Sequence, residues 1–169
     1  FMAAISAHPQ DKRVRESVEA CIDCSLLPGL TVSEAKSQCF SGSKDGTIRI
    51  WSWDGGQGFR CVHTLPVGAP VEALHVLDSW LIAGTAHKGG VNGVVKVWNM
   101  ESQFEQTMEG HQGSVYCLAQ GGAYLFSAGD DMGIKTWQFG GEKFDPVIEL
   151  KGHTAAIQAR PRPPATPAT

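Results

Sequence analysis

Three stretches of the chain repeat one pattern of apolar and polar residues. Each begins with a short apolar run, continues through a Gly-rich polar turn into a second run that alternates apolar and polar side chains, and ends at a tryptophan: Cys39–Trp53, Trp80–Met100 and Tyr124–Phe139. Alternation of this kind is typical of half-buried strands, and the Gly-rich turn between two runs is typical of a tight hairpin. The sequence therefore predicts a repeated β-hairpin.

The tryptophans place the three copies in register. Asp45 lies six residues before Trp51, and Asp131 lies six residues before Trp137. The middle copy has Asn92 at the same distance from its own tryptophan, and its turn is longer, with the extra residues within 86–91. A further strand-like segment precedes each hairpin, at 17–23, 70–76 and 114–120. In the first copy that segment is distant, so residues 26–38 are interpreted as an insertion.

This arrangement resembles the WD-repeat family of β-propellers. The two Gly-His pairs at 110–111 and 152–153 precede strand-like segments and are 42 residues apart, a period within the 40 to 45 residues of that family. The resemblance implies an all-β fold, a partial propeller of about three blades and the start of a fourth. Residues 147–150 are expected to form the outermost strand of a blade whose remainder is absent. It covers residues 17–159, preceded by a polar flank at 1–16 and followed by a Pro-rich tail at 160–169 that we expect to be disordered.

The resemblance also implies which side chains brace each blade through hydrogen bonds. The complete set of His, Ser, Asp and Trp occurs once, as His111, Ser127, Asp131 and Trp137. The first copy has Ser41, Asp45 and Trp51 without a Gly-His pair, whereas the middle copy keeps Trp98 and has Ala83 and Asn92 in place of the Ser and the Asp. The order of segments is further similar to the propeller of plant-type CCCH zinc-finger proteins with WD repeats, although no CCCH finger lies in this chain.

Residues that could carry chemistry are better explained as structural. His111, Ser127 and Asp131 are the residue types of a hydrolase triad, but Ser127 follows an apolar strand start and not the exposed turn that a nucleophile requires. The C-x-x-C at Cys21 and Cys24 has no second pair, and the six histidines are scattered, so neither a metal site nor a cofactor is expected.

Charge, apolar runs and cysteine content indicate which binding partners and which cellular compartment to expect. The net charge of −3 gives no basic excess for nucleic acid, and no apolar run is long enough to span a membrane. Five cysteines without regular spacing favour a reducing compartment, the cytoplasm or the nucleus. We expect a non-catalytic scaffold for other proteins, with Lys88 and Asn92 on the lengthened hairpin as candidate contacts. The alternative is an RNA-associated regulator whose zinc finger lies outside this chain.

A partial propeller is expected to be poorly soluble. The end blades of such a stack have apolar faces that missing blades would cover, because terminal repeats normally need capping. We therefore expect poor solubility and self-association through open blade edges when the chain is expressed alone.

Overall fold

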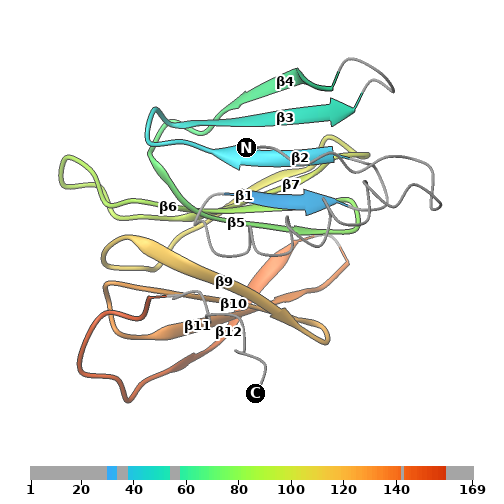
Figure 1. Cartoon of the computed structure of the whole chain (residues 1–169). Helices are drawn as coiled ribbons and strands as arrows, with labels where there is room; N and C mark the ends of the chain where they lie inside the picture. The colour runs from blue at the N-terminus through green and yellow to red at the C-terminus, as the bar shows by residue number, and fades with distance from the viewer. Residues whose placement is uncertain (1–29, 34–37, 54–57, 142, 159–169) are drawn as a thin grey trace, which may run out of the picture.

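The computed structural model describes residues 30–33, 38–53, 58–141 and 143–158, and these form three four-stranded antiparallel sheets. Each sheet is a meander in which strands adjacent in sequence pair with one another (Figure 1). The strands are β1 (Leu30–Ser33), β2 (Gln38–Gly42), β3 (Thr47–Trp53) and β4 (Phe59–Pro66); β5 (Val71–Leu77), β6 (Trp80–Thr85), β7 (Val95–Asn99) and β8 (Glu105–Met108); β9 (Val115–Gly121), β10 (Tyr124–Gly129), β11 (Ile134–Phe139) and β12 (Phe144–Leu150).

The sheets stack in the order of the chain. Figure 1 shows them as three successive layers, and the first strands of neighbouring sheets, β1, β5 and β9, contact one another in turn. Close approach is possible because glycines lie at these contacts: Gly42 packs on Val71, and Gly84 packs on Val115. The all-β fold with side-by-side blades is therefore confirmed, and it is an open, partial propeller.

Two apolar cores fill the spaces between the layers. The first joins Phe40, Ile48 and Ile50 of the first sheet to Val71 and Leu81 of the second. The second core repeats this arrangement one sheet further along, with members from the second and third sheets: Ile82, Val95, Val97, Met108, Val115, Leu125 and Trp137. The second sheet thus buries its two faces against different neighbours, as the inner units of repeat architectures do.

The tryptophans occupy equivalent positions in the three sheets. Trp51 pairs with Cys39, Trp98 pairs with Leu81, and Trp137 pairs with Leu125, each time between the second and third strands. The alignment of the copies on their tryptophans is thus an alignment of strand registers as well.

Two strand assignments from the sequence are wrong. The strand that pairs with β2 is β1 at Leu30–Ser33, inside the segment interpreted as an insertion, and residues 17–23 lie outside the described part of the chain. Residues 147–150 were expected to belong to a blade whose remainder is absent, but they are part of β12, the outermost strand of the third sheet. The physical reason is the same in both cases: each short segment pairs with the hairpin already present.

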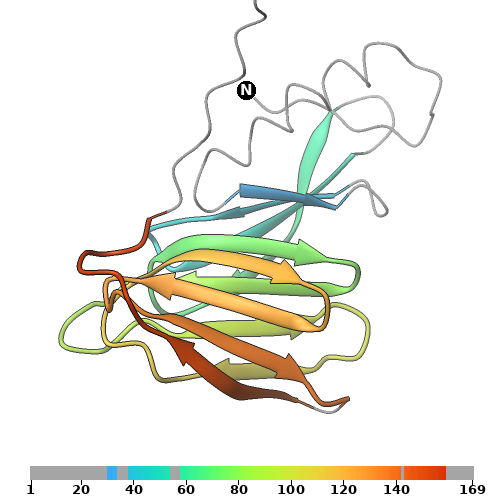
Figure 2. The same ribbon diagram turned by 90° about the horizontal axis from the view of Figure 1, so that it is seen from below.

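The chain after β12 returns toward the first two strands of the third sheet, β9 and β10. The Ile157 amide donates to the carbonyl oxygen of Gly129 at 2.9 Å, which matches the bond from Val71 to Ser43 at 3.0 Å between the first and second sheets. Ile157 therefore occupies the position at which a fourth blade would begin. Figure 2 shows the outward face of the third sheet, which no further sheet of the described residues covers. The expected flank at 1–16 and tail at 160–169 lie outside these residues.

Candidate functional site

Four polar side chains form a hydrogen-bonded chain in the third sheet. The Trp137 indole N–H donates to Ser127 Oγ at 2.8 Å, and Ser127 Oγ lies 2.7 Å from His111 Nε2. The other ring nitrogen of His111, Nδ1, lies 2.7 Å from Asp131 Oδ2. Ser127 lies on β10, Trp137 on β11, Asp131 in the turn between these strands, and His111 in the connection from β8 to β9, so the chain of bonds ties one end of the blade together. We name these four residues the brace.

The proton positions in the brace follow from the donors available. An indole nitrogen can only donate, so Ser127 Oγ accepts from Trp137 and directs its own proton to His111 Nε2. His111 Nδ1–H then donates to Asp131. This assignment needs a neutral imidazole, and burial lowers the pKa of His111 below its usual 6.5, although the adjacent Asp131 opposes the shift.

The brace is unsuited to nucleophilic catalysis. Ser127 is only 1% exposed, and its oxygen is already engaged by both Trp137 and His111. A catalytic serine needs an accessible oxygen with an oxyanion hole beside it. The geometry instead satisfies buried polar groups, each of which would cost about 1 to 3 kcal/mol if left without a partner.

One oxygen of the brace lacks a partner. Asp131 Oδ2 also accepts the Gln112 backbone N–H at 3.2 Å, whereas Oδ1 is buried and has no hydrogen-bond donor. The equivalent aspartate of the first sheet, Asp45, is better supplied, since both the backbone N–H and the hydroxyl of Thr47 donate to its Oδ1, at 2.9 and 2.7 Å. The third sheet has Gly133 in place of that threonine, so the hydroxyl donor is missing.

The first sheet holds part of the predicted set together. The Trp51 indole N–H donates to Ser41 Oγ at 2.9 Å, but both side chains are only partly buried. Asp45 is exposed and bonds within its own turn, so it is separate from the Ser41–Trp51 pair.

The second sheet brings the predicted residues together differently. Ala83 is fully buried opposite Lys96 and offers no hydroxyl to Trp98. Asn92 lies in the lengthened hairpin, where its Oδ1 is 3.2 Å from His87 Nδ1. The role expected for Asn92 in a blade network is thus replaced by a contact inside the hairpin itself.

The lengthened hairpin is held by its own hydrogen bonds. The backbone groups of Lys88 and Val91 exchange two bonds of 3.0 Å around Gly89 and Gly90, which have φ of 61° and 82°. Left-handed conformations at both turn residues favour glycine and give a two-residue hairpin turn. The hairpin is also anchored to the third sheet, because the His87 amide donates to Ser114 Oγ at 2.9 Å.

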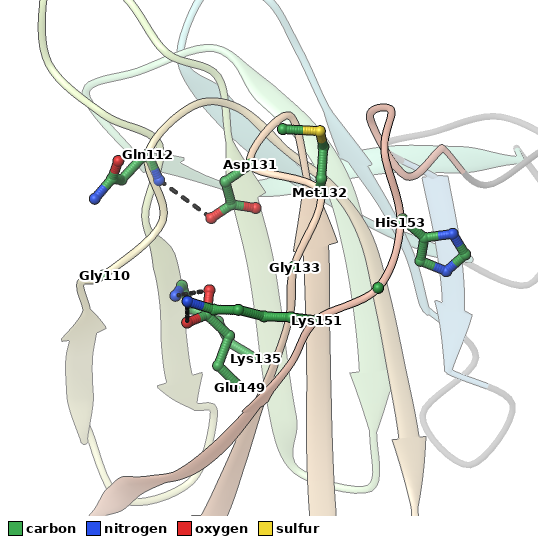
Figure 3. Close-up of a pocket in the computed structure, with 10 residues that line it drawn as sticks. Gly110, Gln112, Asp131, Met132, Gly133, Lys135, Glu149, Lys151 and His153 are labelled. Carbon is green, nitrogen blue, oxygen red and sulfur yellow. Dashed lines mark hydrogen bonds and ion pairs between the residues drawn. The ribbon is translucent and has the colours of Figure 1, made fainter.

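A cavity of about 360 Å³ lies beside the brace (Figure 3). Asp131, Met132 and Gly133 of the β10–β11 turn form one side, and residues 151–153 form another. On its floor Glu149 Oε1 is 3.1 Å from Lys135 Nζ, and Oε2 is 3.1 Å from Lys151 Nζ. Figure 3 shows the Asp131 carboxylate turned toward the side of the cavity on which Lys151 lies.

A second cavity of about 360 Å³ lies between the lengthened hairpin and the segment that leads into the third sheet. It is lined by residues 91–94 and 109–112, and it shares Gly110 and Gln112 with the first cavity. The two cavities are therefore neighbours on one end of the second and third sheets, the end that carries the hairpins between second and third strands. Asn92 lines this second cavity, whereas Lys88 stands at the exposed hairpin tip.

Two features that join the second and third sheets escaped the sequence reasoning. The side-chain amide of Gln106 donates to the Phe144 carbonyl at 2.7 Å and accepts the Phe144 N–H at 2.8 Å. At the same end, Trp80 meets the rings of Phe104, Phe139 and Phe144 edge-on at centroid distances of 4.9 to 5.6 Å. A single glutamine on a strand gives no periodic pattern in the sequence. Only the spacing between Gln106 and Phe144 could have indicated their contact.

Comparison with known proteins gives the fold a family context. The family model "WD domain, G-beta repeat" matches residues 21–52 and 102–138. A zinc finger CCCH domain-containing protein 17 from Oryza sativa subsp. japonica is 34% identical over 134 residues, which are 78% of this chain and 29% of that protein. The tRNA (34-2'-O)-methyltransferase regulator WDR6 of Bos taurus is 30% identical over 139 residues, 78% of this chain and 11% of that protein.

Among solved structures, the RRP9 WD40 repeats are similar with a TM-score of 0.62 and 27% identity, over 75% of this chain and 39% of that one. The chain thus spans less than a third of the length of these two curated relatives. Among the residues whose structure is described, none lies in a helix with the length and apolar character needed to cross a membrane.

Proposed function

Because the chain belongs to the WD40-repeat family, we propose that it is a non-catalytic scaffold, whose blades present loops to other proteins. The observation that carries this proposal is the pre-ordered hairpin at residues 86–92, which has its own bonded turn and an anchor on the neighbouring sheet. A loop that is already ordered loses little conformational entropy on binding, so such a scaffold gains affinity from rigidity. Lys88 and Asn92 are the contact residues that we propose on it.

The test is loss of a defined partner when the hairpin is altered. Chemical cross-linking in extracts of cells that make the chain identifies the proteins that contact it. The amount of each protein captured by the double variant Lys88→Ala, Asn92→Ala is then compared with the amount captured by Lys143→Ala. Lys143 is an exposed lysine at the opposite end of the third sheet. We expect the hairpin variant alone to lose a partner. Equal capture by both variants would contradict a hairpin-centred scaffold.

The second candidate function is regulation associated with RNA. It is supported by the relatives, which include CCCH zinc-finger proteins and a regulator of a tRNA methyltransferase. It requires a CCCH finger in the same protein outside this chain, so the coding sequence upstream tests it directly. Intracellular placement, in the cytoplasm or the nucleus, is part of both proposals, and self-association through the open blade edges is compatible with both.

A further inference from the structure

The two neighbouring cavities form one groove between the lengthened hairpin and the third sheet. Gly110 and Gln112 line both cavities, so the segment 109–112 borders the two. At the outer margins stand two exposed apolar side chains on hairpin tips, Val91 at 69% exposure and Met132 at 41%. The groove is therefore two adjoining pockets with an exposed apolar side chain at each outer margin.

The groove is lined by more carboxylates than ammonium groups. Glu109, Asp131 and Glu149 contribute three negative charges, and Lys135 and Lys151 contribute two positive ones. Lys135 is held against Glu149 with only 16% of its side chain exposed, so it belongs to the wall. Lys151 is 76% exposed, and an exposed ion pair of that kind contributes little stability, so a competing cation can displace it.

A buried oxygen in the groove lacks a hydrogen-bond donor. The Asp131 side chain is only 9% exposed, its Oδ2 is supplied by His111 and Gln112, and its Oδ1 has no donor at all. Unsatisfied buried carboxylate oxygens are rare in native structures and cost free energy. The carboxylate faces the cavity that also holds Glu149 (Figure 3). An incoming group with N–H donors would supply the hydrogen bond that Asp131 lacks. Its positive charge would offset the excess of carboxylates.

We propose that this groove binds an extended peptide segment of a partner protein, and that an arginine or lysine side chain of the segment enters the cavity beside Asp131 and Glu149. An arginine fits best, because its planar guanidinium can donate to two carboxylates at once. A small apolar residue two or three positions away then packs on Val91. This inference rests on the proposed scaffold function and adds the chemistry of the partner.

The experiment compares short peptides on the complete 169-residue chain. The probe is the capped peptide Gly-Ser-Val-Gly-Arg-Ser-Gly, displayed densely on a sensor, with lysine, citrulline or glutamate in place of the arginine in three companions. We expect saturable binding of the arginine and lysine peptides, and binding at least about tenfold weaker for citrulline, which keeps the shape and loses the charge. Equal binding of arginine and citrulline, tighter binding of the glutamate peptide, or no saturable binding would overturn the proposal.

Two variants locate the binding. Glu149→Gln should weaken the arginine peptide about tenfold, since one charged acceptor is lost. Glu105→Gln is the matched control, because Glu105 is an exposed glutamate on β8 whose pair with Lys96 lies outside the groove, and it should bind as the parent does. Unchanged binding by Glu149→Gln would overturn the proposed location. Because Glu149 is 33% exposed and outside the brace, we expect its variant to fold even if an Asp131 variant does not.

Failure of this inference can be told from failure of the scaffold itself. If the peptides show no charge preference while the hairpin variant still loses its cross-linked partner, only the cationic specificity is wrong. If both experiments fail, the scaffold function is wrong as well.

Discussion

Replacing Ser127 by alanine should destabilise the chain far more than the same change at Ser41. Ser127 Oγ serves two buried groups, the Trp137 N–H at 2.8 Å and His111 Nε2 at 2.7 Å, and alanine leaves both without a partner. Each orphaned buried group costs about 1 to 3 kcal/mol, so we expect a loss of about 2 to 6 kcal/mol in the free energy of unfolding. The substituted methyl group fits the space, so no steric cost enters.

Ser41→Ala is an internal control with the same chemistry. Ser41 accepts one bond, from the Trp51 N–H at 2.9 Å, and both residues are partly exposed, so water can replace the hydroxyl. We expect a loss of about 0.5 to 1.5 kcal/mol, the ordinary net value of one hydrogen bond. The second sheet already has alanine at this position, Ala83, which indicates that a blade can form without the hydroxyl.

Urea unfolding followed by circular dichroism measures both variants against the parent. The midpoint and slope give the change in free energy, and an unchanged slope excludes a different folded state. Losses that are equal within error, or a loss below about 1 kcal/mol at Ser127, would refute the view that the brace is a buried and fully coupled set.

Three further outcomes follow from the same contacts. Burial lowers the pKa of His111 in the folded chain below the usual 6.5. The neutral His111 side chain therefore contributes its full stabilisation above pH 6.5, and this contribution is lost as the pH falls through the folded pKa. The urea midpoint of the parent should fall from about pH 8 to about pH 5, and more steeply than the midpoint of His111→Ala. Gln106→Ala should cost about 2 kcal/mol and speed hydrogen exchange at the Phe144 amide, because both bonds to that residue are lost; unchanged exchange would contradict the cross-blade contact. Leu150 and Met108 occupy equivalent positions on the outermost strands of the third and second sheets, but they are 44% and 3% exposed. Leu150→Lys should therefore raise solubility at nearly constant stability, whereas Met108→Lys should unfold the chain. Equal effects would mean that the outer face of the third sheet is covered.

The residue pattern was enough for the hairpins and their order. An Asp six residues before a Trp reflects the length of a hairpin turn plus half a strand, and the structure places Trp51 and Trp137 in the same register. Side-chain alternation follows directly from strand geometry, so it survives in a single sequence. The all-β fold and the partial propeller were therefore predictable.

Strand pairing at the ends of a repeat was not predictable in the same way. The segment at Leu30–Ser33 alternates apolar and polar residues, but with only four residues the pattern is too short to distinguish a strand from an insertion. The sequence of residues 147–150 is consistent with a strand but does not indicate which hairpin the strand pairs with, so the prediction assigns them to another blade. In the structure they pair with β11 through backbone hydrogen bonds.

The candidate site was predictable only where side chains recur in the repeat. The Ser, Asp and Trp of the brace recur in the first copy as Ser41, Asp45 and Trp51. In the third sheet the structure brings these three residue types and His111 together at hydrogen-bond distance. The groove does not recur, because it depends on the lengthened hairpin of the second sheet. It also depends on Glu149 meeting two lysines, Lys135 on β11 and Lys151 just after β12. Contacts of that kind arise from tertiary packing and leave no spacing in the sequence.

The central claim is that the sheets are successive blades stacked in chain order, and nuclear Overhauser contacts between them test it most directly. Gly42 lies against Val71, and Gly84 lies against Val115, each pair across one blade boundary. We predict cross-peaks from the Gly42 α-protons to the Val71 methyl groups and from the Gly84 α-protons to the Val115 methyl groups. Cross-peaks from Gly42 to Val115 in place of these would contradict the stacking order.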